Sequence, residues 1–253
     1  MRASLVDRLS REGTLLLGGG RAILLQVADP IVGVAAATHS NFANRPINRL
    51  HNTLTFVYGV MLGTPAEAAI VAKVTSRVHA RIPRANDPER QLWVAATLYD
   101  TAVRVFERIH GPIDPVDADL VLASYARLGT ALEVPAAAWP ASTAEFRTYW
   151  STAVSSLEVG PHARQVAHDL FHPATAPLWL RAVLPFMNLL TASLLEPSLR
   201  DAYGMPWSPA HERRANAAWT VIRAITRVLP QRVLTAPSRR YLARVRAMLN
   251  RVS

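Results

Sequence analysis

The chain contains no cysteine, and Lys73 is its only lysine among 28 basic residues. Without cysteine there are no disulfides, no thiolate metal ligands and no cysteine nucleophile. The sequence also lacks a glycine-rich phosphate loop with lysine, the zinc motif H-E-x-x-H and the nucleophile motif G-x-S-x-G. These absences remove several common classes of nucleotide-binding, zinc-dependent and serine-dependent enzymes.

Hydrophobic runs of membrane-spanning length are missing too. The nearest is the stretch from Leu178 to Leu195, which Arg181 and Pro185 interrupt, and it predicts a buried or interfacial helix pair. The first twenty residues are charged and broken by glycine, unlike a secretory signal. We therefore expect a cytoplasmic protein, and we allow for peripheral membrane contact through this stretch and the arginines.

A basic charge balance dominates the composition, with a net charge of +10 and a pI of about 11.0. The arginines are spread along the chain, and neither a zinc-finger spacing nor an RNA-recognition motif accompanies them. A solvated basic face explains this pattern, so no nucleic-acid partner is expected.

The hydrophobic periods are mostly helical, and strand signals are scarce. Thr64-Pro65 with Glu67 predicts a capped helix that runs to Ile82, and Asp87-Pro88 predicts a longer helix that ends at Gly111. We predict an all-α fold in which residues 1–253 form a single domain of about ten helices around an apolar cofactor or substrate cavity. Residues 1–17 and 231–253 are expected to be peripheral.

Histidines are the main candidates for metal ligands. His39 and His79 lie in or beside apolar helices, where a histidine is more often a hydrogen-bonded core residue than a ligand. His168 and His172 are four residues apart and could chelate a metal, but they also fit the end of a helix.

Arg49 and Thr53 are four residues apart and therefore share a helix face. An arginine beside a hydroxyl can anchor a carboxylate, such as a haem propionate, or polarise dioxygen. The alternative is a surface arginine whose stem packs over the helix.

The order of several segments carries a resemblance. These segments are H-S-x-F from His39, R-L-x-x-T from Arg49, G-T-P-A-E from Gly63, "WVAATLYD" from Trp93 and "YGMPW" from Tyr203. In this combination the chain resembles the MpaB-type oxygenases, which include the rubber oxygenase (latex-clearing protein) catalytic domain. The resemblance covers roughly Gly18 to Leu229.

The resemblance implies an all-α, haem b protein that uses dioxygen to oxidise isoprenoid double bonds. One characterised member acts on a prenylated intermediate bound to the endoplasmic reticulum, and another acts on polyisoprene. Arg49 and Thr53 match an arginine and a threonine on the distal haem side of the rubber enzyme. Asn52 stands where that enzyme has a lysine able to reach the iron.

Two positions depart from the family pattern. Ala95 replaces a histidine that matches the proximal haem ligand in many members, and Asp29 replaces the histidine of an A-H-P motif. Alanine cannot ligate iron, so the resemblance leaves His79 and His39 as the candidate ligands. Asp29 then becomes a candidate acceptor for an imidazole N–H, and Tyr99 is placed near the cofactor.

Two functions remain open from the sequence. The first is a haem-dependent oxygenase that acts on a lipophilic, isoprenoid-like molecule. The second is a haem-free relative that keeps the apolar cavity as a hydrophobic-ligand-binding protein or as an enzyme of different chemistry.

Overall fold

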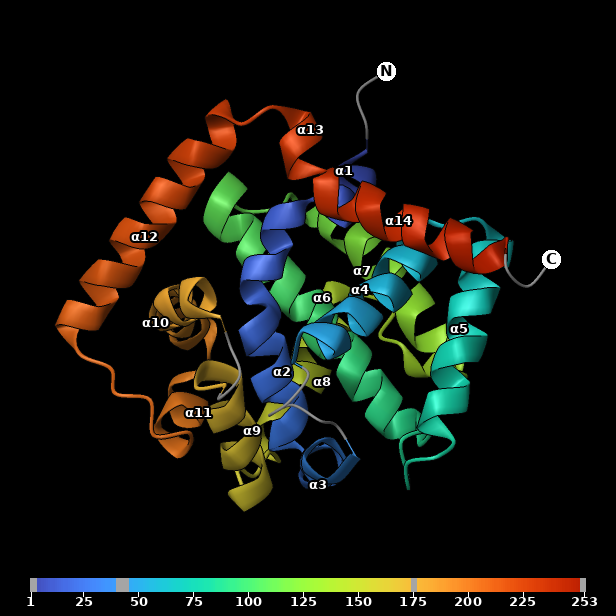
Figure 1. Cartoon of the computed structure of the whole chain (residues 1–253), viewed down its shortest axis with the longest axis horizontal. Coiled ribbons are helices and arrows are strands. Elements are labelled where there is room, and N and C mark those ends of the chain that lie inside the picture. The colour runs from blue at the N-terminus through green and yellow to red at the C-terminus, as the bar shows by residue number, and fades with distance from the viewer. Residues whose placement is uncertain (1–3, 40–45, 174–176, 251–253) are drawn as a thin grey trace.

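The fold is helical throughout the part of the chain that the structure describes (Figure 1). This structure is a computed structural model that describes residues 4–39, 46–173 and 177–250, without the side chains of residues 39 and 46–49. Fourteen α-helices and no strand occur in these ranges, which confirms the predicted all-α class.

The α-helices follow one another along the chain with short connections. They are α1 (Leu5–Arg11), α2 (Gly19–Ala28), α3 (Pro30–His39), α4 (Pro46–Leu62), α5 (Pro65–His79), α6 (Pro88–His110), α7 (Pro115–Thr130), α8 (Thr143–Ser155), α9 (Pro161–Phe171), α10 (Leu178–Leu194), α11 (Pro197–Ala202), α12 (Pro209–Val228), α13 (Gln231–Leu234) and α14 (Ala236–Leu249). Two short 3₁₀ turns lie at Gly13–Gly18 and Ala136–Ala138.

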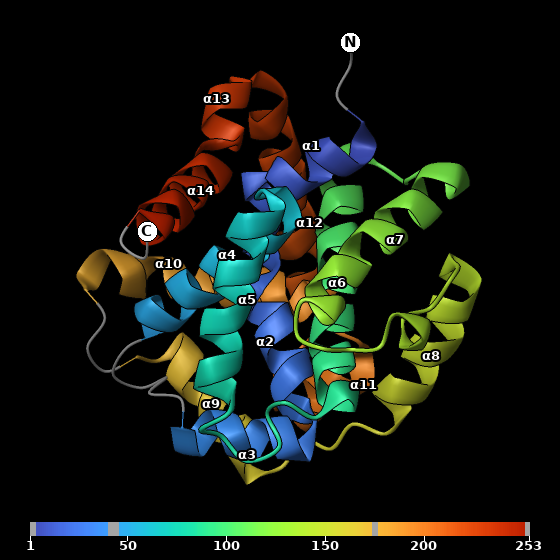
Figure 2. The same cartoon turned by 90° about the vertical axis from the view of Figure 1, so that its right-hand side faces the viewer.

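Helices α2 and α6 form the centre of the molecule (Figures 1 and 2). They pack against each other, α6 also contacts α7 and α12, and α2 also contacts α3, α9 and α10. Leu24 and Leu25 of α2 are fully buried, and so is Ala96 of α6. Trp93 of α6 donates from Nε1 to the carbonyl of Leu25 at 3.2 Å, which ties the two helices together inside the core.

The helix starts predicted from the sequence are confirmed by their caps. Thr64 Oγ1 accepts from the N–H of Glu67, and Glu67 accepts in return from the N–H of Thr64, as in a capping box. The helix that they begin ends at His79 rather than at Ile82. Ile82 precedes Pro83, and a proline disfavours helical geometry at the residue before it.

The stretch from Leu178 forms one helix, not the expected pair, because α10 continues through Pro185. No single described helix is long and apolar enough to cross a membrane. One bent pair, Gly13–Ala28 with Pro30–Thr38, meets the length and composition test at an angle of 109°. Helix α2 belongs to this pair, and most of its residues are buried inside the protein.

The C-terminal helix α14 lies across α4 and α5 (Figure 1). Its Val245 is fully buried in the main core, and Tyr241 stacks on Tyr58 of α4 at 5.7 Å between ring centroids. Residues 231–253, predicted to be peripheral, thus include a helix that covers one side of α4.

Candidate functional site

The first turn of α6 contacts two of the predicted site residues. Its consecutive residues Arg90 and Gln91 contact Asp29 and His79, respectively. Figure 2 shows why: α3, the end of α5 and the start of α6 lie at the same lower end of the molecule. Ala95 and Tyr99 follow at intervals of four along α6, so they line the helix face that continues from Gln91 into the core.

His79 is the last residue of α5 and is half-buried. Its Nδ1 lies 2.9 Å from Nε2 of Gln91, a side chain that is itself buried and also donates to the carbonyl of Ala85. Because the Gln91 amide nitrogen donates, Nδ1 is the acceptor and the neutral ring carries its proton on Nε2. The opposite amide orientation would place the proton on Nδ1, but it would also set Oε1 against the Ala85 carbonyl and lose that hydrogen bond.

Asp29 begins α3. Its Oδ1 accepts from the backbone N–H groups of Ile31 and Val32, both at 2.9 Å, and its Oδ2 lies 3.5 Å from Nε of Arg90. Aspartate is a favoured helix N-cap for this reason. The described contacts of the carboxylate are therefore to backbone and guanidinium groups, and the predicted contact to an imidazole is not among them.

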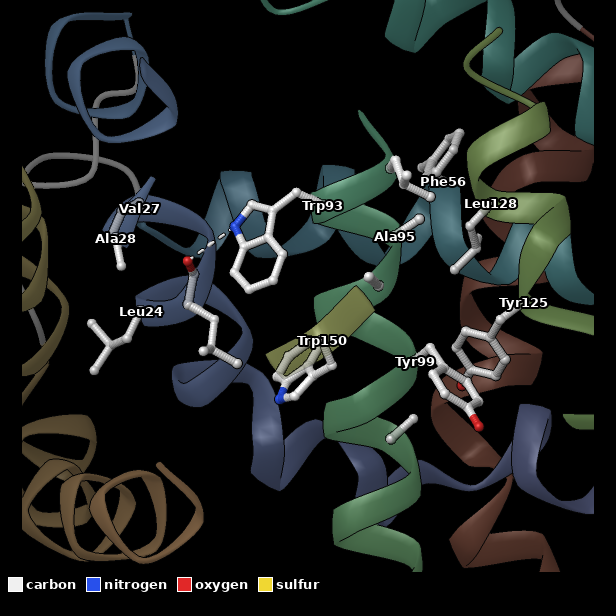
Figure 3. Packing of buried hydrophobic residues seen from close by; sticks show 14 of the residues in the cluster. Leu24, Val27, Ala28, Phe56, Trp93, Ala95, Tyr99, Tyr125, Leu128 and Trp150 are labelled. Atoms are coloured by element: carbon white, nitrogen blue, oxygen red, sulfur yellow. Dashed lines mark hydrogen bonds between the residues drawn. The ribbon is translucent and has the colours of Figure 1, made fainter. Parts of the chain in front are cut away.

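Ala95 is 3% exposed and belongs to the main hydrophobic cluster. Figure 3 shows it between Trp93 and Tyr99 on α6, with Phe56 and Leu128 on the neighbouring helices nearby. An alanine surrounded by close-packed apolar side chains offers no atom to a metal. The residues at this position therefore do not fit a haem ligated from α6.

Tyr99 lies in an aromatic cluster one turn beyond Ala95. Phe146 contacts its ring edge-on at 4.6 Å between centroids, and Tyr125 and Trp139 do so at 5.6 and 6.3 Å. Burial raises the pKa of Tyr99 to about 12, so its phenol stays protonated at physiological pH. Its described surroundings are those of a core residue.

The remaining predicted site residues belong to the end of α3 and the first half of α4. Thr53 is exposed on this helix, whereas the side chains of Arg49 and His39 lie outside the described residues. The predicted pocket around His39, Arg49 and Thr53 therefore stays a prediction. His51, between Arg49 and Thr53, directs Nδ1 to the Tyr241 hydroxyl at 2.5 Å.

Three other described histidines also contact protein groups. His110 packs its ring at a tilt against Phe106 and places Nε2 3.4 Å from the Glu12 carboxylate. His168 and His172 stack on each other in an exposed position. Among the described residues, no group of three or more histidine, aspartate or glutamate side chains is arranged to hold a metal ion.

Sequence reasoning missed a buried ionic cluster in the centre of the molecule. Arg21 of α2 is fully buried, and its guanidinium contacts Asp100 at 2.7 Å and Glu196 at 2.8 Å. Arg104 contacts the same two carboxylates from the exposed side. Asp100, which has no evident partner in the sequence, thus has two, and the cluster joins α2, α6 and the start of α11.

Comparison with known proteins identifies a family and two relatives. The family model described as "ER-bound oxygenase mpaB/B'/Rubber oxygenase, catalytic domain" matches residues 7–224. Two uncharacterised proteins, from Mycobacterium bovis and Mycobacterium tuberculosis, are each 30% identical to this chain over an alignment of 224 positions that covers 83% of this chain and 88% of theirs. No solved structure matches the chain.

Proposed function

Because the chain belongs to the family of the mpaB and rubber oxygenase catalytic domains, we propose that it is a haem-dependent oxygenase. Its substrate in this proposal is a lipophilic, isoprenoid-like molecule, and dioxygen is the co-substrate. The family match supports an oxidoreductase, and the cofactor and the substrate class are our own inference. A bound haem would supply the activation of dioxygen.

The observation that carries the proposal is the fixed imidazole of His79. A histidine that ligates a metal usually has its second ring nitrogen held by a neighbouring polar group, which orients the ring. Gln91 is in the position to do this, since its buried amide contacts Nδ1 at 2.9 Å. In the structure the ring proton lies on Nε2, so iron ligation through Nε2 requires the Gln91 amide to turn until Oε1 accepts a proton from Nδ1, and in turning the amide gives up its hydrogen bond to the Ala85 carbonyl.

The chain's own groups then have separate roles. Gln91 would orient the imidazole that holds the haem, and Leu92 and Trp93, which are buried at the start of α6, would help to exclude water there. Arg49, at the start of α4, is proposed to bind a haem propionate or to orient dioxygen, with Thr53 on the same helix face. The position of His39 at the end of α3 makes it the alternative ligand.

Haem binding is tested by the Soret absorption of protein expressed with a haem precursor. We expect the wild type to show a Soret band and the His79→Ala variant to lose it. His162→Ala is the matched control, because His162 is exposed at the start of α9, and it should leave the band unchanged. A Soret band that persists in both His79→Ala and His39→Ala would refute the ligand assignment.

Gln91→Glu tests whether Gln91 positions the imidazole. A carboxylate accepts the proton of Nδ1 without a flip and makes the imidazole a stronger electron donor. We expect the Soret maximum and the iron reduction potential to shift while the band remains. An unchanged spectrum and potential would mean that Gln91 only fills space beside His79.

The core at Ala95 favours a second candidate function. If close packing has replaced the haem site there, the chain is a haem-free relative that binds a hydrophobic ligand or runs a different chemistry. Both the wild type and the Ala95→His variant would then be colourless, even after expression with a haem precursor. That result would support this candidate over the oxygenase.

A further inference from the structure

The net positive charge of the chain lies entirely in its C-terminal segment. Arginines occur along the whole sequence, but the acidic residues end at Glu212. Residues 213–253 contain ten arginines and no aspartate or glutamate, which leaves 18 basic and 18 acidic residues in the part before them. Of the arginines in this segment, only Arg246 pairs with a carboxylate that the structure describes, that of Glu67. A strongly cationic segment is thus joined to an otherwise neutral chain.

Helix α12, in this segment, carries apolar side chains on two opposite faces. One face packs against α6 and α10 and buries Ala215 and Trp219. On the opposite face, Val221, Ile225 and Val228 are 56%, 49% and 81% exposed. Their spacing of four and three residues places them in one line along the helix, which we call the outer stripe of α12. The first face holds α12 to the protein, whereas the outer stripe faces solvent.

Exposed arginines accompany the outer stripe and continue beyond it: Arg213, Arg214, Arg227 and Arg232. Arg214 precedes Val221 by seven residues, or two helical turns, so both side chains project from the same side of α12. Helix α13 follows directly and exposes Val233, at 51%. In Figure 1, α12 forms the left outer edge of the molecule and α13 lies at its top. An apolar stripe bordered by arginines is typical of a helix that lies in a membrane interface.

The arginines narrow the choice of partner for the outer stripe. A second copy of the chain, docked stripe to stripe, would bring the arginines of both copies together, and like charges repel. A nucleic acid would use the arginines for its phosphates and would leave the valines without a role. Helix α10 also exposes apolar side chains, but it carries only Arg181 and therefore attracts an anionic surface less. Charge thus favours α12 over the stretch from Leu178 as a membrane contact.

We propose that the outer stripe of α12 binds the surface of a membrane that contains anionic phospholipids. The valine and isoleucine side chains enter the boundary between the headgroups and the acyl chains, and the neighbouring arginines bind the phosphates and carboxylates of the headgroups. The arginines of α13 and α14 add to the attraction because they increase the positive potential at the same end of the chain. This surface uses none of the proposed haem ligands, so its test does not depend on haem.

Flotation with phosphatidylcholine vesicles, with and without phosphatidylserine, tests the charge requirement. The wild type should float with the vesicles that contain phosphatidylserine, but not with phosphatidylcholine alone or in about 1 M salt, which screens the charges. Arg213→Gln combined with Arg214→Gln should weaken binding at least about 10-fold. Arg77→Gln combined with Arg147→Gln removes the same charge from exposed sites on α5 and α8, and this matched control should stay within about 3-fold of the wild type.

A fluorescent label tests whether the outer stripe enters the membrane, since the chain has no cysteine of its own. Val228→Cys, labelled with a polarity-sensitive dye, should shift its emission to the blue when phosphatidylserine vesicles are added. Val74→Cys carries the same dye at an exposed valine of α5, which lies across the molecule from α12 in Figure 1, and its emission should not change. The helical circular dichroism signal should be the same for both proteins.

Several results would overturn the proposal. They are the absence of flotation, equal flotation with both kinds of vesicle, equal loss of binding in the two pairs of arginine variants, and an unchanged emission of the label at residue 228. Binding of a nucleic-acid duplex by a wild type that does not float with vesicles would also overturn it, and would assign the arginines to that partner instead.

Discussion

At the scale of single residues, the site was only partly predictable. The sequence identified His79 from its place beside apolar helical residues, but not Gln91, the group that fixes its ring. Gln91 lies between Asp87 and Ala95 on the buried face of an amphipathic helix, where an apolar residue is expected. A polar residue at such a position is the signal that could have revealed it. The role of Asp29 as a helix cap could also have been found from a local signal, because a carboxylate before Pro30 is a helix-start signal.

The core around Ala95 predicts the effect of restoring the family's histidine. Ala95→His adds a ring beside Phe56 and Leu128, where the side chains are already close-packed. We expect the free energy of unfolding to fall by about 1–3 kcal/mol, as for other overpacked cores, without a gain in the Soret band. Urea unfolding and absorption spectra measure the two effects. A variant that is as stable as the wild type and binds more haem would mean that a cofactor space exists beside α6.

At the scale of the elements, the helices were predictable because their start signals are local. Thr64 with Glu67, Asp87 with Pro88, Asp114 with Pro115 and Ser142 with Glu145 all form the caps that their spacing predicts. The helix across Pro185 was not predictable, because tertiary contacts of its buried second half hold α10 together despite the missing hydrogen bond.

The cap of α5 makes a pH-dependent contribution to stability. The backbone hydrogen bond from Thr64, helped by Arg246, lowers the pKa of Glu67 below its usual value of 4.5 although burial acts in the opposite direction. A carboxyl whose pKa is lowered by folding contributes stability above its unfolded pKa, and this contribution is lost as the pH falls through the folded pKa. Glu67→Gln should therefore reduce the free energy of unfolding at pH 7 by about 1–2 kcal/mol.

The difference between Glu67→Gln and the wild type should begin to shrink as the pH falls below about 4.5, where Glu67 of the unfolded chain becomes protonated, and it should vanish below the lower folded pKa, where Glu67 is protonated in both states. Glu145→Gln, at the exposed cap of α8, is a matched control with a smaller effect. A wild-type-to-variant difference that stays constant from pH 7 to pH 3 would contradict the assigned role.

At the scale of the whole molecule, the buried ionic cluster was beyond the reach of sequence reasoning. Arg21 and Glu196 are 175 positions apart, and nothing local to either residue indicates the other. The cluster forms only when α2, α6 and the chain after α10 pack together, so it depends on the complete fold. For the same reason, the sequence predicted the helical class and not the arrangement of the helices around α2 and α6.

Arg21 should be among the most sensitive positions for stability. Arg21→Leu removes the buried partner of Asp100 and Glu196, and loss of one member of a buried ion pair costs about 3–5 kcal/mol. Arg104→Gln, which removes the partly exposed guanidinium from the same carboxylates, should cost about 1 kcal/mol or less. Urea unfolding measures both. Equal losses in the two variants would mean that burial of Arg21 does not determine the energy of the cluster.

The position of α14 shows that the folded unit extends beyond the stretch of sequence that matches the family. The family match ends at residue 224, before α14 begins, yet α14 buries Val245 in the main core and stacks Tyr241 on Tyr58 of α4. A chain cut at the end of the match would expose this side of α4, and with it the helix that carries Arg49 and Thr53. Deletion series and domain transplants should therefore retain the chain through Leu249, because α4, which carries residues of the proposed haem site, is covered by a helix outside the family match.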